Sequence, residues 1–272
     1  PLERLMQTLP TQGKMILRNL FQRPVRTVFS SLGISTSVMI MVIGTFMYDA
    51  VDNMLELQFD LLQRESVTIT FFGPVSSDIE LAIAKEKSVL YTEGYRLVPI
   101  RIRSGSLSKE ILLQGLPKGA ELRRLIGEGE KILTPPETGI LLNSQVAGKL
   151  GISVGQEIQL EILEGNRKKV IVIVEGIVTE ILGQGAYMER KAVSRLLGEG
   201  DSFNLLALRT DANEEVSLLR KLKSIPKIGG VTTRAGTLKV FHEMTSRSML
   251  ATTLVLLIFV SIIDIGVVYT TS

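Results

Sequence analysis

The most pronounced pattern in the sequence is an uncharged apolar run near the N-terminus. Between Arg26 and Asp49 lie 22 residues without a charged side chain. As a helix they would extend about 33 Å at 1.5 Å per residue, which matches a hydrocarbon core of about 30 Å. The run ends in acidic sequence that lacks the Ala-x-Ala pattern of a signal-peptide cleavage site. We therefore expect residues 27–48 to form a transmembrane helix, with a buried helix of a soluble protein as the alternative.

A second apolar run lies near the other end of the chain. Residues 249–269 contain a single charged side chain, Asp264, and are long enough for a second spanning helix. Because lysine and arginine favour the cytoplasmic side of a membrane, the charges around the first run predict a cytoplasmic N-terminus and residues 49–248 outside the cytoplasm. Those charges are three arginines before the run and four acids after it: Arg18, Arg23, Arg26, Asp49, Asp52, Glu56 and Asp60.

The 200 residues between the two runs have the mixed pattern of a folded domain. Apolar residues among acids after Asp49 predict that the first helix continues outward as an amphipathic stalk, and a second stalk is expected from Thr237 onward. Gly73-Pro74 is expected to end the first strand, and Gly165-Asn166 to form the turn of a hairpin. We predict strands at 67–72, 95–103, 110–114, 156–163, 168–182 and 203–209, and short helices at 76–87, 191–197 and 213–225.

The fold class expected from this pattern is a membrane protein in which two transmembrane α-helices flank a mixed α/β extracytoplasmic domain. The strand at 95–103 is predicted from the alternation of Leu97, Ile100 and Ile102 with Arg96, Arg101 and Arg103. The predicted organisation is a cytoplasmic connector at 1–26, a helix at 27–48, the domain with its stalks at 49–248, a helix at 249–269 and the start of a truncated cytoplasmic segment at 270–272.

Composition removes several kinds of chemistry. The 31 basic and 28 acidic residues are interspersed, which argues against a nucleic-acid surface. The absence of cysteine excludes disulfides, thiol nucleophiles and cysteine metal sites. The single histidine, His242, lies in the predicted second stalk and is interpreted as a solvated residue. We therefore expect no metal site of the usual kinds.

Two stretches approach nucleotide-binding motifs without meeting them. In NSQVAGKLG, Asn143 stands where a phosphate-binding loop needs glycine, and Leu150 stands where a serine or threonine would meet magnesium. GQGAYM, at 183–188, lacks the third glycine of a dinucleotide fingerprint and is interpreted as a loop. The residues thus supply little material for a catalytic site, and we expect no cofactor.

Small residues and one acid are the candidate contact positions in the membrane helices. Ser30, Gly33, Ser37 and Gly44 fall on one helical face and predict close packing against another membrane helix, although glycine and serine are also common in such helices generally. Asp264 is either a polar contact between helices or an acid near enough to the cytoplasmic surface to be wetted, and the second interpretation is favoured.

Three stretches resemble one known family. LRNLFQRPVRTVFSSLGI resembles the first membrane helix of FtsX/MacB-like ABC transporter permeases. ETGILLNSQVAGKLGISVGQEIQL is similar to the periplasmic core domain of that family, with Gln156 in place of the usual acid, and GVVYTTS resembles the end of its second helix. Gly151 can end the short helix of the middle stretch, so folding alone also explains that motif. The segment ahead of the first helix is similar to the connector of permeases built from two units, which suggests a fragment comprising the second unit.

This resemblance implies a multi-pass protein of the inner or plasma membrane that transmits motion and is driven by a separate cytoplasmic ATPase. The implied partners are that ATPase, further transmembrane helices of the same or a second permease, membrane lipid, and an extracytoplasmic cargo or adaptor. The expected function is export or extraction of a hydrophobic or peptide cargo. The alternative is an FtsX-like signal relay that regulates a cell-wall hydrolase or senses an envelope ligand.

Overall fold

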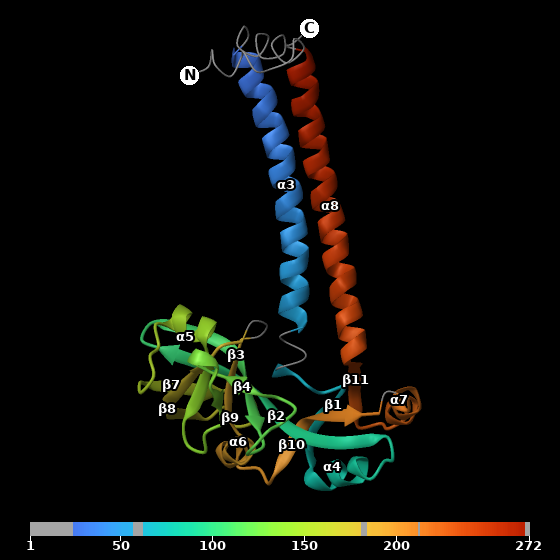
Figure 1. Cartoon of the computed structure of the whole chain (residues 1–272). Helices are drawn as coiled ribbons and strands as arrows, with labels where there is room; N and C mark the ends of the chain where they lie inside the picture. Colours follow the sequence, from blue (N-terminus) through green and yellow to red (C-terminus); the bar gives the residue numbers. More distant parts are fainter. Residues whose placement is uncertain (1–23, 57–61, 181–183, 212, 270–272) are drawn as a thin grey trace. The chain divides into compact units, whose positions relative to one another are not determined.

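The computed structural model describes residues 24–56, 62–180, 184–211 and 213–269 (Figure 1). The chain divides into two compact units. One unit contains the greater part of two long helices, and the other, Asn53–Val240, is an α/β domain. The mixed α/β class expected for the middle of the sequence is confirmed.

The two long helices are α3 (Pro24–Glu56) and α8 (Arg234–Tyr269). Within the described residues, Ser31–Leu55 of α3 is long and apolar enough to cross a membrane, with a mean hydropathy of 1.6. Apolar side chains along it, such as Val38 and Phe46, are exposed. α8 runs without a break through the predicted second stalk and the second apolar run, and its crossing of a membrane stays a prediction.

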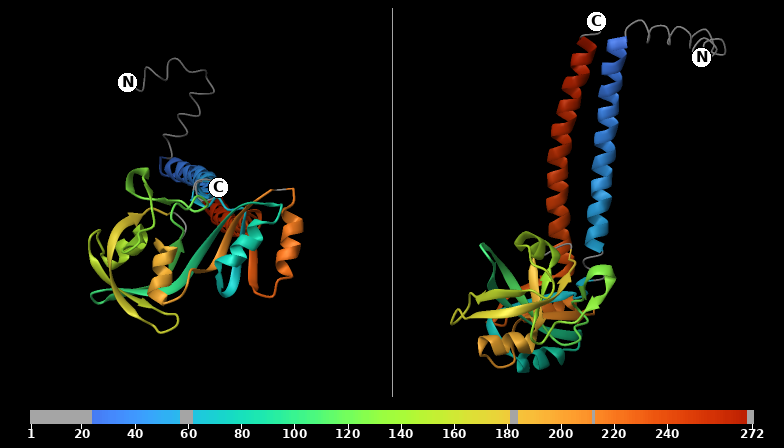
Figure 2. Two further views of the ribbon diagram at one scale, coloured as in Figure 1. Left: turned by 90° about the horizontal axis from the view of Figure 1, so that it is seen from below. Right: turned by 90° about the vertical axis from the view of Figure 1, so that its left-hand side faces the viewer.

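The first lobe of the domain is an antiparallel sheet covered by two helices. Its strand order is β11 (Ile228–Thr233), β1 (Val67–Ser76), β10 (Ser202–Thr210) and residues 89–95 of β2 (Val89–Ser104). Alternate apolar residues of β1 and β10 face α4 (Ser77–Ala84) and α7 (Glu215–Lys223), and with them they form one hydrophobic core. In the left view of Figure 2, α4 is cyan and α7 is orange.

The second lobe is a closed barrel. Residues 96–104 of β2 pair with both β3 (Leu107–Leu116) and β7 (Glu157–Ile162), which closes the order β2-β3-β9-β6-β8-β7. The remaining barrel strands are β6 (Ile140–Asn143), β8 (Lys169–Val178) and β9 (Gly185–Glu189). Interior residues of the barrel and the apolar faces of α5 (Ser144–Leu150) and α6 (Arg190–Leu197) form the largest core. The left view of Figure 2 shows this lobe beside the first, in green and yellow.

A third core lies where the lobes meet. It includes Tyr95 and Leu205 from the first lobe and Leu141 and Tyr187 from the second. The loop after β3 contributes further residues, and it carries the short hairpin β4 (Leu125–Ile126) and β5 (Ile132–Leu133) with the 3-10 turn η2 (Glu128–Glu130) between them. β2 belongs to both lobes, so it is the continuous link between them.

Local sequence signals explain the short helix α5. The Asn143 side chain accepts the Gln145 N–H at 2.8 Å and caps the N-terminus of the helix. Gly151 ends it in the left-handed region with φ 61°, which a residue without Cβ adopts at no steric cost. The expected helix end at Gly151 and the expected hairpin of β7 and β8 are both confirmed.

Two local predictions are wrong. β1 does not end at Gly73-Pro74 but continues to Ser76. Its pairing with β10 shifts register between Thr70 and Val75, so Gly73 and Pro74 lie in an irregular stretch within the strand. GQGAYM is not simply a loop, since Gly185–Glu189 forms the buried strand β9, held between β3 and β6. A buried strand with neighbours on both sides shows no alternation of polar and apolar residues.

Candidate functional site

The chain enters and leaves the domain sheet at neighbouring strands. β1 and β11 pair with Val67 opposite Thr233, and the Arg234 N–H donates to the Ser66 carbonyl at 2.8 Å. Thr233 caps α8, since its hydroxyl accepts the Gly236 N–H at 3.0 Å. The first turn of α8 is therefore bonded to the residue that precedes β1.

The incoming segment, residues 62–66, is fixed to the loop after β3. Two backbone hydrogen bonds of 2.7 and 2.9 Å flank a β-bridge between Gln63 and Arg123. Both cross between residues 62–66 and 122–124, so the segment is held as a short added strand. Their donors and acceptors are the Arg64 N–H with the Leu122 carbonyl, and the Arg124 N–H with the Leu62 carbonyl.

Arg123 is the centre of a largely buried polar cluster. Its guanidinium lies 2.6 Å from Glu65 and 2.7 Å from the Gln114 side-chain oxygen, and 5.0 Å from the centre of the Tyr95 ring. Burial alone would lower the pKa of Arg123, but the Glu65 carboxylate opposes this and holds the pKa above its ordinary value. The side chains of Arg123 and Glu65 are 12% and 7% exposed. This pair joins the incoming segment to the domain core.

Two further carboxyl groups are buried near the third core. Glu93 accepts the Tyr95 hydroxyl at 2.6 Å and the backbone N–H groups of Glu121 and Leu122 at 2.6 and 3.1 Å. Glu180 is bonded to the Tyr187 hydroxyl. Burial raises the pKa of both carboxyls, and the hydrogen bonds they accept only partly offset it.

These raised pKa values predict a pH dependence of stability. Between the ordinary carboxyl pKa of 4.5 and the raised values, the folded chain binds more protons than the unfolded chain. The free energy that Glu93 and Glu180 contribute is therefore fully present below pH 4.5 and falls as the pH rises through this window. We expect the stability of the wild type relative to a Glu93→Gln/Glu180→Gln variant to decline as the pH rises, measured by urea unfolding of the full chain in detergent.

A control for this pH profile is Glu137→Gln. The hydrogen bond from Lys118 lowers the pKa of the exposed Glu137 carboxyl. Any free energy that Glu137 contributes to folding is therefore lost as the pH falls, in contrast to that of Glu93 and Glu180. A stability difference between the wild type and the double variant that stays constant with pH would contradict the assignment.

β2 passes from the first lobe to the second between Tyr95 and Arg96, and side-chain contacts hold the residues on either side of this point. The Asn204 amide accepts the Leu97 N–H at 2.7 Å and donates to the Leu97 carbonyl at 2.9 Å, replacing a strand partner. The side chain of Arg96 is fully buried and binds Glu164 and Glu199 with shortest contacts of 2.8 and 3.0 Å. Arg96 thus ties β2 to the β7–β8 turn and to the end of α6.

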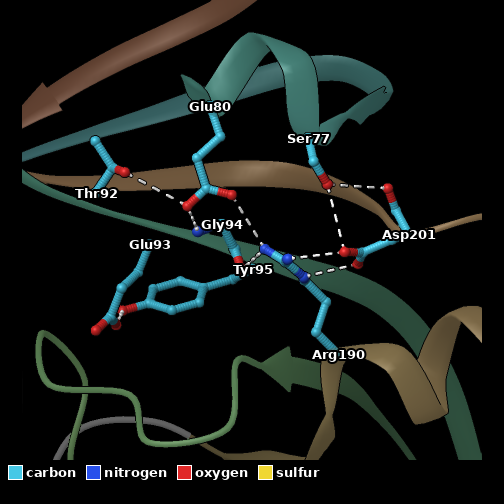
Figure 3. Close-up of polar contacts among 8 residues, drawn as sticks. All are labelled: Ser77, Glu80, Thr92, Glu93, Gly94, Tyr95, Arg190 and Asp201. Atoms are coloured by element: carbon cyan, nitrogen blue, oxygen red, sulfur yellow. Dashed lines mark hydrogen bonds and ion pairs between the residues drawn. The ribbon is translucent and has the colours of Figure 1, made fainter. Parts of the chain in front are cut away.

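A second arginine cluster joins the helices of the two lobes (Figure 3). Arg190, at the start of α6, lies 3.3 Å from Glu80 on α4 and 3.0 Å from Asp201, which precedes β10. Its guanidinium also donates to the Gly94 carbonyl of β2 at 3.0 Å, while Glu80 accepts the Gly94 N–H at 3.0 Å. Ser77 donates to Asp201 as well. One side chain therefore contacts α4, β2 and the strand that returns to the first lobe.

The ion pairs of these three arginines connect separate parts of the α/β domain. Arg123 holds the incoming segment, and Arg96 and Arg190 hold the two lobes on either side of the crossing strand. Charge-assisted bonds of this kind are stronger and more directional than neutral ones. Within the described part of the chain, no three His, Cys, Asp or Glu side chains are arranged to hold a metal ion.

The residues singled out in the sequence lie elsewhere. Gly33 and Gly44 lie on α3, where Gly33 is buried and Gly44 is exposed with open space around its Cα. The side chains of Ser30, Ser37 and Asp264 fall outside the described side chains, so helix packing through them stays a prediction. His242 is an exposed residue of α8.

The buried ion pairs of Arg96, Arg123 and Arg190 were not predicted from the sequence. Arg96 was interpreted together with Arg101 and Arg103 as a polar strand position, but its side chain is fully buried and theirs are 31% and 47% exposed. The available signal was its position, because Arg96 shares a strand face with Val98 and Ile100, which point into the barrel. Nothing local marked the contact of Arg123 with Glu65 or that of Arg190 with Glu80, since these partners are 58 and 110 residues away.

No family model and no curated protein matches the sequence. Among solved structures, the chain is similar to the periplasmic region of MacB from Actinobacillus actinomycetemcomitans, with 12% identity, TM-score 0.43, and 66% of this chain and 94% of that chain covered. It is similar to the extracellular domain of the noncanonic ABC-type transporter YknZ from Gram-positive bacteria, with 13% identity, TM-score 0.42 and coverages of 56% and 87%.

A domain of a putative permease protein from Porphyromonas gingivalis is a further match, with 12% identity, TM-score 0.32 and coverages of 58% and 79%. All three likenesses concern the fold alone.

Proposed function

We propose that this chain is part of a non-catalytic permease subunit of an ABC transporter, anchored in the inner or plasma membrane through α3 and α8. In this proposal a separate cytoplasmic ATPase drives movement of the membrane helices, and the α/β domain converts that movement into export or extraction of a hydrophobic or peptide cargo. The Arg-Pro-x-Arg-Thr, Leu-Gly-Ile and Lys-Leu-Gly stretches that resemble permeases support it, as does the apolar length of α3.

The observation that carries the proposal is the pairing of β1 with β11. A displacement of α8 along its axis acts on β11 directly, since the strand ends at Thr233 and the helix begins at Arg234. The ladder of hydrogen bonds to β1 then shares the load with the strand that follows α3. From there β10 and β2 lead into the barrel. Each step is a hydrogen-bonded sheet contact.

We expect the full permease, co-expressed with the ATPase encoded beside it, to form a complex whose ATP turnover differs from that of the ATPase alone. ATP binding should also change amide hydrogen exchange in β1 and β11, because these strands connect the long helices to the domain. Both quantities are measured on the purified complex in detergent or nanodiscs.

A flexible insertion separates mechanical coupling from assembly. Four Gly/Ser residues placed between Thr233 and Arg234 should leave the complex intact and abolish the ATP-dependent exchange change in the domain. The same insertion after Gly105 is the matched control, since this residue lies in the exposed turn between β2 and β3, where an added Cβ would meet nothing within 4 Å. Absence of a complex together with unchanged ATP turnover would contradict the proposal, and capture of a wall hydrolase by the same protein would favour the signal relay.

A further inference from the structure

A cavity of about 340 Å³ lies on the first lobe, on the side of the sheet opposite α4 and α7. Tyr91 of β2 and Arg209 of β10 lie directly opposite each other, so their side chains are on the same face of the sheet. That face continues along the same strands into Tyr95 and Ala207 of the third core, whereas Leu208 faces the helices. The lining consists of Arg64, Leu90, Tyr91, Glu121, Leu122 and Arg209.

Two guanidinium groups in this lining have no ion-pair partner among the described residues. Arg64 and Arg209 form no ion pair with any other described residue, in contrast to Arg96, Arg123 and Arg190. The lining has one carboxylate, Glu121, so its formal charge is +1. Unpaired arginines beside a concave surface attract anions, and their planar fork fits a phosphate with two parallel hydrogen bonds.

The rest of the lining supplies a fixed frame with apolar surface. The loop that carries Glu121 and Leu122 is held by the two backbone N–H bonds to Glu93, and Leu122 is buried. The Leu122 carbonyl accepts the Arg64 N–H at 2.7 Å, which fixes the backbone of that arginine. Leu90 is 65% exposed, which leaves an apolar wall beside the charged groups. Partial burial and nearby carboxylates raise the pKa of Tyr91, so its hydroxyl stays a hydrogen-bond donor at neutral pH.

We propose that this cavity binds a phosphate group, with Arg64 and Arg209 as its two ligands and Tyr91 as an additional donor. The volume lies near the lower end of the usual range for small-molecule sites, about 300–1,000 Å³, and exceeds what a phosphate ion alone requires. The space beside Leu90 and Leu122 therefore accommodates a small organic body attached to the phosphate. Two sources share this chemistry: free phosphate, and the headgroup of a phospholipid, which is relevant because Arg64 follows the end of α3 at Glu56 by eight residues.

The test is calorimetric titration of the intact chain in uncharged maltoside micelles. One arm uses inorganic phosphate and the other uses dihexanoyl phosphatidylglycerol below its micelle concentration, both at constant ionic strength. Saturable binding is expected in at least one arm. Comparable binding in both arms identifies the phosphate itself as the recognised group, and binding of the lipid alone identifies a phosphate ester. Absence of saturable binding in both arms overturns the proposal.

Variants separate a site from general charge attraction. Arg64→Gln and Arg209→Gln should each weaken binding about tenfold, the typical effect of losing a charge-assisted hydrogen bond. Glu121→Gln should strengthen it, because the opposing charge is removed. Arg220→Gln is the matched control, since Arg220 is exposed on α7 on the other side of the sheet. Equal binding by the wild type and the two arginine variants overturns the site, and so does a loss in the Arg220 variant as large as theirs. This outcome is independent of whether an ATPase binds the chain.

Discussion

Replacement of Arg123 by methionine is expected to reduce the free energy of unfolding by about 3–5 kcal/mol, the usual cost of leaving one member of a buried ion pair alone. Glu65, 7% exposed, would lose the guanidinium that lies 2.6 Å from its carboxylate. One of its oxygens, Oε2, already has no hydrogen-bond partner among the described residues, so the remaining contacts offer little compensation. Methionine retains much of the apolar volume of the arginine stem, which keeps the loss specific to the charge. Urea unfolding of the full chain in detergent measures the effect.

The paired variant Arg123→Met/Glu65→Met distinguishes a lost attraction from an unpaired charge. With both charges removed, most of the stability should return, because the desolvation cost of the carboxylate disappears as well. Arg220→Met, at an exposed position of α7, should change stability by no more than about 0.5 kcal/mol. If Arg123→Met changed the free energy of unfolding no more than Arg220→Met does, the ion pair with Glu65 would not be what holds the incoming segment.

Replacement of Gly94 by valine is expected to be the second most damaging of these substitutions, with a loss of about 1–3 kcal/mol or more from overpacking. A Cβ at this position would lie 2.7 Å from Arg190 Nη1 and 2.9 Å from Phe203 Cγ. The guanidinium can move aside only by giving up its bond to the Gly94 carbonyl, and the Phe203 ring is fully buried against Phe71. The substitution therefore strains the junction of the lobes at the contact drawn in Figure 3.

The matched control is Gly73→Val in β1, where a Cβ would meet nothing within 4 Å. This variant should stay close to wild-type stability, since valine also suits an extended strand. Gly94→Ala made in an Arg190→Met background would retain the clash with Phe203 and relieve the clash with the guanidinium. Equal stability losses for Gly94→Val and Gly73→Val would show that close packing at the junction is not the cause.

Much of the fold follows from local pattern. The uncharged run after Arg26 predicts a long helix, and alternation or short apolar runs predict most strands, because side-chain period reflects which face is buried. Capping residues such as Asn143 and Gly151 define the ends of a helix within a few residues of sequence. Strand β9 escaped this reasoning because it is buried on both faces and has no polar positions to reveal a period of two.

The candidate site could not be predicted in the same way. An arginine on a strand is usually a solvated residue, and whether it is buried depends on carboxylates that folding brings to it. Arg96 meets Glu199, 103 residues later, and Arg190 meets Glu80, 110 residues earlier. A single sequence contains no signal for such distances. The phosphate cavity likewise joins residues from the incoming segment, β2, the loop after β3 and β10.

The apolar helices, the charge bias around the first of them, the absence of thiol chemistry and the α/β class could all be inferred from the amino-acid order alone, since each depends on composition or on neighbours within a few turns. Long-range contacts of the folded chain were needed to establish that the barrel closes through β2 and β7 and that β1 and β11 lie side by side. The same holds for the finding that Arg96 is paired whereas Arg64 and Arg209 have no ion-pair partner among the described residues. The physical reason is that burial and charge pairing are properties of the space around a side chain, and long-range strand pairing sets that space.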